Sequence, residues 1–465
     1  MFHFGGDNDN LSFKKHKDFY FFSSYGSFNT TSNFFKANVG TGKWAVKFAA
    51  TLNYSDNDYT FIDTRYKNSD GSLLKNENGV YKNYGVNFSL GYQFSSKNKL
   101  YFYTTGYYGD RLFSDGLPNP AAGSERNEDF NQRNLLKWKY SFSNFTQTLN
   151  VAYLTQEYRY YDDKNATDYV FGKSKNYNIN YNLKYRFSNY LKMETSLIYD
   201  ENRGTTNEVF SKKRTLFAGI AKVTFKPTEK LTTAINIRKK SNSDFEVPLL
   251  VSVAAEQEIT DNLALKANVS TNYRIPTFNE LYWPVVGNLD LIPEESVQGE
   301  IGASFKKKNI AITTSLFYIH LKHKILWLPT AASNLWRPRN VGDVTHSGAE
   351  TAVKLSKKIN EHSFNFSTNY TFTLAKNKET DTFLPYAPKH LLNFNLDYEY
   401  KKISFFMQHL YQSKVYTNEI NLDFYSLESL NVTNFGGDFK VFENKKNKIK
   451  IGFKVNNIFN NVYYF

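Results

Sequence analysis

The chain has 465 residues and a net charge of +14, and it combines 35 Tyr and 41 Phe with a mean hydropathy of −0.56. It has no cysteine, which excludes a disulfide scaffold, a cysteine-ligated zinc or iron–sulfur site and a thiol nucleophile. Its lysines form no dense patch, so the charge suits anionic lipid head groups or an anionic ligand better than nucleic acid.

Strict alternation of apolar and polar residues recurs along the chain and predicts β-strands with one apolar and one polar face. The first recognisable strand lies near Asp18–Phe28, and alternation is clearest in Tyr177–Phe187, Leu263–Tyr273, Leu392–Tyr400 and Ile449–Val455. No long stretch has the period of an amphipathic helix, and no apolar run approaches the ~18 residues of a membrane helix. The fold class is all-β, and any membrane span must be made of strands.

The connections between these strands alternate in length. Short connections are expected at Thr41–Lys43, Ser95–Asn98, Ser143–Asn144, Ser188–Asn189, Lys226–Lys230, Thr260–Asn262 and Lys306–Asn309. Long connections are expected at Asp56–Val80, Arg111–Gln132, Tyr160–Lys173, Glu201–Lys213, Ile275–Glu295, Ile325–Asn340 and Ala375–Lys389. About 21 strands with short turns on one rim and long loops on the other predict a transmembrane antiparallel β-barrel. Such a barrel also provides a lipid-facing surface for the many aromatic side chains.

Four motifs in order, each at a predicted strand boundary, carry a resemblance to a known family. They are NYRIPTFNELYWPVVGNLDLIPEESVQGEIG (Asn272–Gly302), PRNVGDVTHSGAETAVKL (Pro338–Leu355), YAPKHLLNFNLDY (Tyr386–Tyr398) and KVNNIFNNVYYF (Lys454–Phe465). The chain resembles the β-barrel part of TonB-dependent outer-membrane receptors, most sharply over its C-terminal part. The matching residues include Arg274, Pro276, Glu280, Leu281, Gly287, Asn288, Leu291, Pro293, Glu294, Glu300, Gly302, Gly348 and Glu350.

Most of these motif residues are expected to be architectural. Proline cannot donate to a ladder and therefore sits where strands end, as at Pro276 and Pro293. Gly287–Asn288 can supply a turn with positive φ. Glu280 and Glu294 can form ion pairs with Arg274 or cap loop amides. A contact with ligand is the alternative role for the same residues.

Candidate ligand contacts lie in two predicted long loops, where aromatic and cationic side chains occur together. They are Tyr282, Trp283, Trp327, Trp336, Arg337 and Arg339. Such groups can stack on a macrocycle and pair with carboxylate or phosphate. For Trp327 and Trp336 the alternative is membership of the interfacial aromatic belt, which we favour from the sequence.

The resemblance implies a barrel of the 22-strand type in the cell outer membrane, with short periplasmic turns and long extracellular loops. In the family an N-terminal plug fills the barrel, and TonB pulls on a short N-terminal box. No signal peptide, plug or TonB box is visible before the first predicted strand, and the motifs stop where the family would lead us to expect a closing strand. We therefore expect an irregular segment at 1–17 and a barrel at 18–465, forming a truncated receptor. TonB is an expected partner only if plug and box are present.

The expected function is uptake of a scarce nutrient, such as a ferric siderophore or cobalamin, by a monomeric barrel in outer-membrane lipid. The sequence contains no nucleophile, P-loop or metalloprotease motif, so no enzyme activity and no cofactor are expected. His320 and His323 are three apart in a predicted strand and point to opposite faces, so no metal site is expected there. A passive channel without a plug and a surface-binding barrel remain the alternatives.

Overall fold

The computed structural model describes residues 11–62, 73–114, 123–207, 211–329, 335–444 and 446–462. Twenty-one of its strands belong to one antiparallel sheet, and six shorter strands form three separate two-stranded sheets. The chain divides into two compact units: 1–187 with 193–221 and 239–247, and 188–192 with 222–238 and 248–465. In the described residues no helix is long and apolar enough to cross a membrane.

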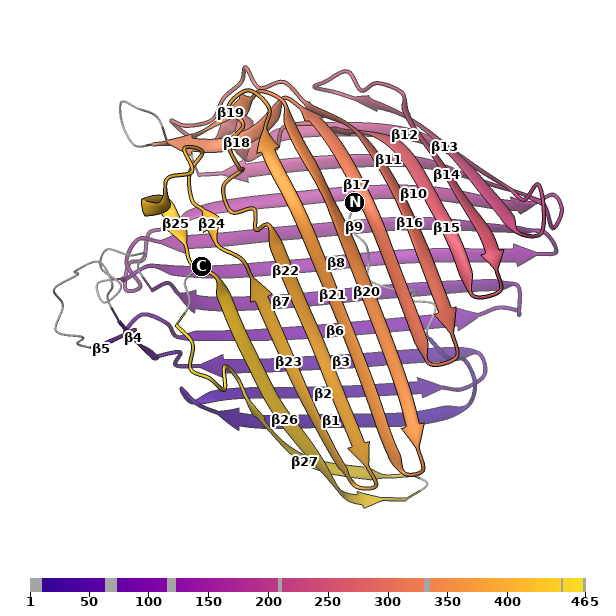
Figure 1. The fold of residues 1–465 in the computed structure, drawn as a ribbon, viewed down its shortest axis with the longest axis horizontal. Coiled ribbons are helices and arrows are strands. Elements are labelled where there is room, and N and C mark those ends of the chain that lie inside the picture. Colours follow the sequence, from indigo (N-terminus) through magenta and orange to yellow (C-terminus); the bar gives the residue numbers. More distant parts are fainter. Residues whose placement is uncertain are drawn as a thin grey trace. The chain divides into compact units, whose positions relative to one another are not determined.

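In the first unit each large strand pairs with the next one along the chain (Figure 1). The strands are β1 (His16–Gly26), β2 (Thr30–Gly40), β3 (Trp44–Ser55), β4 (Thr60–Ile62), β5 (Leu73–Lys75), β6 (Tyr81–Gln93), β7 (Asn98–Leu112), β8 (Arg126–Phe142), β9 (Phe145–Tyr161), β10 (Val170–Arg186), β11 (Leu191–Thr206) and β12 (Lys212–Phe225). The hairpin of β4 and β5 is separate from the large sheet.

The second unit continues the same sequential pairing, from β13 to β27. Its elements are β13 (Leu231–Asn242), β14 (Leu250–Thr260), β15 (Leu263–Arg274), α1 (Phe278–Tyr282), β16 (Glu294–Lys307), β17 (Ile310–Lys322), β18 (Lys324–Pro329), β19 (Trp336–Val341), β20 (Val344–Ile359), β21 (His362–Asn377), β22 (His390–Tyr400), β23 (Ile403–Gln412), β24 (Val415–Tyr416), η1 (Asp423–Tyr425), β25 (Ser426–Leu427), β26 (Leu430–Glu443) and β27 (Lys448–Val455). The hairpins β18–β19 and β24–β25 are separate two-stranded sheets.

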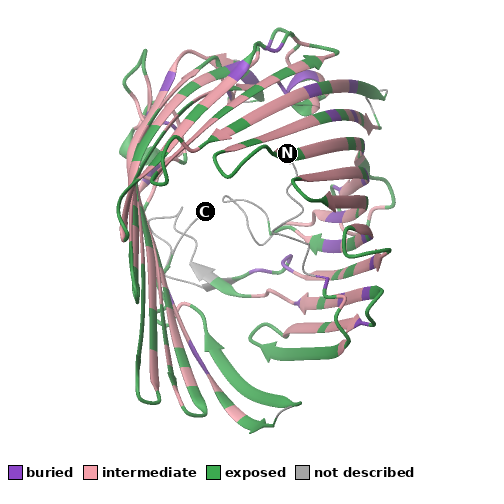
Figure 2. Cartoon of the chain, turned by 90° about the vertical axis from the view of Figure 1, so that its right-hand side faces the viewer, coloured by how far each residue is buried: buried purple, intermediate pink, exposed green. Residues whose placement is uncertain are grey.

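The two faces of the strands differ in a way that a soluble sheet does not. On β10 the apolar residues Tyr177 and Ile179 are 40% and 45% exposed, and Val151 opposite Ile179 is 41% exposed. The polar face holds Asn176, which is buried and donates to Asp200. Exposed and half-buried positions dominate the strands, and buried ones are few (Figure 2). An exposed apolar face opposite a hydrogen-bonded polar face is expected of strands that contact lipid.

The predicted rhythm of long and short connections is present, except at the start of the chain and between β11 and β12, where the connection 207–211 is no longer than the short connection 226–230. Ser27 and Thr30 enclose a tight turn in which Phe28 and Asn29 have φ of 58° and 52°. Two positive φ angles match the twist of a two-stranded hairpin, so β1 and β2 are joined without a long loop. Elsewhere the long connections alternate with short ones such as 41–43 and 143–144.

Several long loops are shorter than the sequence predicts, because the strands continue into charged segments. Strand β8 already begins at Arg126, within the predicted loop Arg111–Gln132, and β10 begins at Val170. Charged residues interrupt the alternation in these segments but pair across strands, as Arg111 does with Asp129 at 3.0 Å. The long connections at 243–249 and 413–429 also exist, although the sequence did not single them out.

A candidate ligand-binding rim in the second unit

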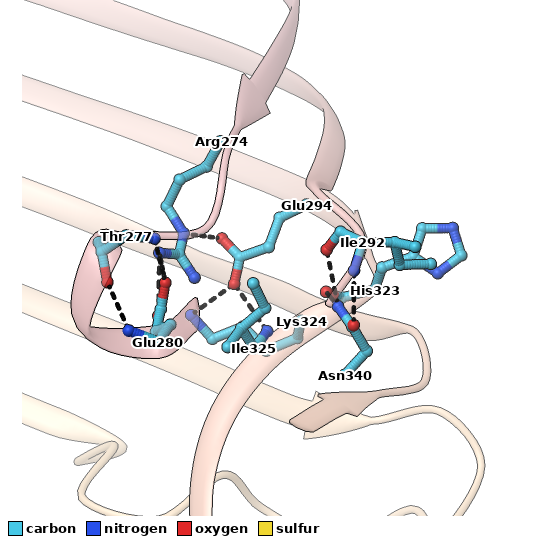
Figure 3. Close-up of polar contacts among 9 residues, drawn as sticks. All are labelled: Arg274, Thr277, Glu280, Ile292, Glu294, His323, Lys324, Ile325 and Asn340. Atoms are coloured by element: carbon cyan, nitrogen blue, oxygen red, sulfur yellow. Dashed lines mark hydrogen bonds and ion pairs between the residues drawn. The ribbon is translucent and has the colours of Figure 1, made fainter. Parts of the chain in front are cut away.

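Arg274, the last residue of β15, binds the carboxylates of Glu280 in the following loop and of Glu294, the first residue of β16 (Figure 3). Its Nε donates to Glu294 Oε2 at 2.5 Å, and its Nη1 lies 3.1 Å from both oxygens of Glu280. Glu280 and Glu294 are only 8% and 5% exposed. Because a buried carboxylate is costly without a partner, the guanidinium fixes both ends of the loop between β15 and β16. We call residues 275–293 the motif loop.

The short helix α1 gives the motif loop its shape. Thr277 accepts a hydrogen bond from the Glu280 amide through its Oγ1, and the Thr277 amide donates to Glu280 Oε2, which is a complete capping box. Leu281 and Leu291 are 4% and 3% exposed, so the loop has a small apolar interior. Five helical residues would not be stable in isolation, and the ion pairs with Arg274 hold them in place.

Glu294 also ties the motif loop to the hairpin of β18 and β19. Its Oε1 accepts the Ile325 amide at 2.8 Å and lies 3.5 Å from Lys324 Nζ (Figure 3). Asn340 forms the second tie: its Oδ1 accepts the Ile292 amide, and its Nδ2 donates to the carbonyls of Ile292 and His323. The loop and the hairpin are therefore one hydrogen-bonded assembly, the rim cluster.

The turn prediction for Gly287 and Asn288 is wrong. Neither residue has a positive φ; the residue that does is Val285, with φ 67°. Gly287 is required for a different reason, because a Cβ there would lie 2.7 Å from the Leu281 carbonyl oxygen and from the Trp283 nitrogen. Asn288 donates from its side chain to the Pro338 carbonyl at 3.0 Å, a third tie to the hairpin.

The hairpin separates the aromatic and cationic candidates that the sequence placed together. Trp327 is opposite Pro338 and Trp336 is opposite Pro329, so both tryptophans lie on one face. Arg337 and Arg339 alternate with them and lie on the other face. The indole rings and the guanidinium groups therefore do not share one surface of the hairpin.

Exposure distinguishes the candidates further. Trp336 is 51% exposed and Trp283 is 42% exposed, whereas Trp327 and Tyr282 are half-buried. Arg337 donates to the Val285 carbonyl at 2.7 Å and so serves the motif loop. Trp327 and Trp336 belong to a hairpin outside the 21-stranded sheet, which argues against their membership of an interfacial belt on that sheet.

The remaining motif residues lie in and beside the strands. Pro276 is buried in the motif loop, and Pro293 immediately precedes β16. Glu300 on β16 is exposed and accepts from Asn268, and Glu350 on β20 is exposed. At Gly348 a Cβ would lie within 2.7 Å of the Phe317 ring and still closer to a carbonyl oxygen of β21, so this position also requires a close approach. The structural assignment of these residues stays a prediction.

Metal-binding groups are not assembled in the residues that the structure describes. His320 lies on β17 and binds Asp343 at 2.8 Å, while His323 follows the strand with φ 56°. In the first unit the Lys75 ammonium contacts Asp58 at 2.6 Å and lowers the pKa of that carboxyl. Asp343 and Asp58 are therefore already paired with protein side chains.

Sequence reasoning did not identify Thr277 or Asn340 as parts of the site. The pattern Thr277–x–x–Glu280 is a capping-box signature and was available in the sequence. Asn340 lies within the motif Pro338–Leu355, but its contacts could not be predicted, because its partners Ile292 and His323 contribute only backbone atoms from distant parts of the chain. The last predicted motif residues, Tyr463–Phe465, lie outside the described residues.

Comparison with known proteins gives a consistent result. Residues 6–458 match the family model described as TonB-dependent receptor-like, β-barrel. The vitamin B12 transporter BtuB of Photobacterium profundum is 28% identical over 209 residues, which are 44% of this chain and 34% of that protein. BtuB of Vibrio vulnificus is 28% identical over 132 residues, 28% of this chain and 22% of that protein. The chain spans about a third or less of these relatives.

Solved structures show the same fold at low identity. The FrpB iron transporter from Neisseria meningitidis superposes with a TM-score of 0.78 and 13% identity, over 99% of this chain and 79% of that one. The copper transporter OprC superposes with a TM-score of 0.77 and 14% identity, over 97% and 75% of the two chains. The siderophore receptor PirA from Acinetobacter baumannii gives 0.77 and 15%, over 96% and 77%.

The family accounts for what the strands show. Sequential antiparallel pairing, an exposed apolar face and alternating long and short connections are the features of a transmembrane barrel wall. Members of the family are receptors and transporters of the outer membrane, not enzymes. With its match over residues 6–458, the chain belongs to the TonB-dependent receptor-like β-barrel family.

Proposed function

We propose that this chain forms the barrel of an outer-membrane receptor for TonB-dependent uptake of a scarce nutrient, with cobalamin as the first candidate. The family match over residues 6–458 is the observation that carries the proposal. Cobalamin is preferred over a ferric siderophore because the curated relatives at 28% identity are vitamin B12 transporters. The iron and siderophore transporters are similar at only 13–15% identity, which speaks for the fold alone.

The rim cluster supports a role in ligand capture. It holds a long loop and a hairpin in one arrangement, and a ligand that meets a preorganised surface loses less affinity to ordering. Trp283 and Trp336 are its exposed indole rings, and Arg339 is an exposed guanidinium on the other face of the hairpin. We propose that the two indoles contact the macrocycle and that Arg339 attracts an anionic group at a separate point. Arg337 positions the motif loop through the Val285 carbonyl.

Equilibrium binding to the purified full chain in detergent tests this proposal. We expect saturable quenching of tryptophan fluorescence by cyanocobalamin. Changing Trp336→Ala should weaken binding by about 2 kcal/mol, the loss typical of a buried aromatic contact at an interface. Trp44→Phe is the matched control, because Trp44 packs on Tyr92 beside a short connection, outside the loops proposed to hold ligand.

The outcomes separate the candidate functions. If the chain binds ferric siderophores in a manner that depends on Trp336, and does not bind cyanocobalamin, the receptor proposal stands and the proposed ligand changes to a siderophore. Binding of neither, together with steady conductance across a planar bilayer, would support a passive channel instead. Dependence of uptake on TonB is tested in cells, by comparing accumulation of labelled ligand with and without a functional TonB protein.

A further inference from the structure

A charged hollow lies on the apolar face of the first unit, at the long-connection ends of β9, β10 and β11. Its volume is about 450 Å³, and its charged lining consists of Lys173, Lys175, Arg203 and the single carboxylate Glu157. It is distant in sequence from the motif loop, and no part of the proposed uptake function uses it. The hollow has three cations and one carboxylate, so its charged groups do not neutralise one another.

Strand register places the hollow on the lipid-facing side. On β10, Lys173 and Lys175 lie on the same face as Tyr177 and Ile179, because residues two apart in a strand point to the same side. Towards the short connections this face becomes an apolar hollow of about 240 Å³, whose lining includes Val151 and Ile179. The face thus changes from apolar to cationic along the strands. In a barrel of this family that boundary is where lipid acyl chains give way to head groups.

The charges around the hollow leave a cationic surplus. Glu157 contacts both Lys173 at 2.9 Å and Arg159 at 3.0 Å. Glu201 contacts Arg203 at 2.7 Å and Lys213 at 2.8 Å in the same manner. Each carboxylate therefore serves two cations. Within the described ranges no carboxylate is within ion-pair distance of Lys175.

Aromatic rings hold the cations in position. The Arg159 guanidinium lies 5.1 Å from the centre of the Tyr169 ring, and Arg203 lies 5.9 Å from that of Tyr177. Tyr169, Tyr177 and Phe171 also line the hollow. Rings of this kind favour the interface between hydrocarbon and water. A ligand that complements this site would need an anionic head group for the cations. It would also need an acyl chain for the aromatic rings and the adjoining apolar strip.

We propose that this hollow binds a phosphate of a glycolipid head group in the outer leaflet, with an acyl chain along the Val151–Ile179 strip. The inference rests on the outer-membrane placement in the proposed function but not on the identity of the transported ligand. The bound lipid would fix the height of β9–β11 in the membrane. It would also neutralise the surplus that Lys173, Lys175 and Arg203 create.

The test is titration of the purified full chain with fluorescent bis-phosphorylated lipid A in neutral detergent. The variant Lys173→Gln/Lys175→Gln/Arg203→Gln should bind at least about tenfold more weakly, since each cation near a lipid surface contributes on the order of a fivefold factor. The matched control Lys184→Gln/Lys192→Gln/Lys222→Gln removes the same charge from the polar face of β10, β11 and β12 and should bind as the unchanged chain does.

Three further measurements decide between the explanations. Lys173→Arg/Lys175→Arg keeps the charge and should retain binding, which excludes misfolding of the neutral variant as the cause. Dephosphorylated lipid A should bind far more weakly, and inorganic pyrophosphate at equal phosphate concentration should compete poorly. Equal loss in the matched control, or full competition by pyrophosphate, would overturn the lipid assignment. Unchanged cyanocobalamin binding by the neutral variant separates this result from the proposed uptake function.

Discussion

Two charged clusters, the rim cluster and the charged hollow, lie at strand ends beside long connections but differ in the balance of cations and carboxylates. In the rim cluster Arg274 and Lys324 face Glu280 and Glu294, and both carboxylates are under 10% exposed. Around the charged hollow four cations share the carboxylates of Glu157 and Glu201, Lys175 adds a fifth cation, and the side chains of the four paired cations are between about a third and a half exposed. In the rim cluster the cations and carboxylates are equal in number, so they pair with one another and fix the shape of the loop. Around the charged hollow the cations are in excess, so they can still bind an external anion.

The strongest test of this contrast is Glu294→Gln in the rim cluster. The change weakens contacts to Arg274, Lys324 and the Ile325 amide, so we expect a loss of about 3 kcal/mol in the free energy of unfolding. Urea titration of the chain in detergent measures it. Glu300→Gln at an exposed position of the same strand serves as control and should change stability by less than about 0.5 kcal/mol. Similar losses in both variants would show that the cluster is not the source of rigidity.

Gly287→Ala tests whether the motif loop tolerates any added volume. The new Cβ would lie 2.7 Å from the Leu281 carbonyl oxygen, and relieving that overlap should cost about 1–3 kcal/mol. The loop should become sensitive to limited proteolysis between Trp283 and Leu291. Gly219→Ala is the matched control, since a Cβ there meets nothing within 4 Å. An intact, protected loop in the Gly287→Ala chain would contradict the close approach described above.

Asn340→Ala should release the hairpin from the motif loop without unfolding either strand pair. Three hydrogen bonds join Asn340 to Ile292 and His323, and their loss should cost about 1–2 kcal/mol. Hydrogen exchange at the Ile292 amide reports this directly and should accelerate about tenfold or more. Asn365→Ala on an exposed position of β21 should leave that exchange unchanged. Unchanged protection at Ile292 would refute the tie.

The smallest effect on stability is expected at the charged hollow. Glu157→Gln removes the carboxylate shared by Lys173 and Arg159, whose side chains are about a third exposed, so we expect a loss of about 1 kcal/mol or less in the free energy of unfolding. The same change increases the cationic surplus and should strengthen lipid A binding several-fold. Fluorescence titration and urea unfolding of one preparation measure both quantities. Weaker lipid binding would show that Glu157 positions Lys173 for the contact and that surplus charge alone does not explain it.

Much of the strand architecture was predictable, because alternation is a local property that each strand carries in its own residues. Tyr177–Phe187 and Leu392–Tyr400 fall within or next to β10 and β22 with the expected faces. Strand ends were less predictable: at Arg126 and Lys173 cross-strand ion pairs, to Asp110 and Glu157, continue the ladder where the apolar period stops. Those pairs depend on register, which no single segment encodes.

The rim cluster was predictable only in part. Arg274, Glu280 and Glu294 were identified as candidate ion-pair partners, and the structure brings them together. The sequence placed tryptophans and arginines next to one another as candidate ligand contacts, but hairpin register assigns Trp336 and Arg337 to opposite faces. When the conformation of a loop is unknown, adjacent residues are easily assumed to contribute to one binding surface. In a strand, adjacent side chains point to opposite faces.

The most direct test of the receptor account is an equilibrium isotherm of cyanocobalamin binding to the purified chain and to its Trp336→Ala variant. The account predicts saturable binding that the variant weakens by about 2 kcal/mol, with Trp44→Phe unchanged. Absence of saturable binding, both for cyanocobalamin and for a panel of ferric siderophores, would contradict a ligand-capturing rim.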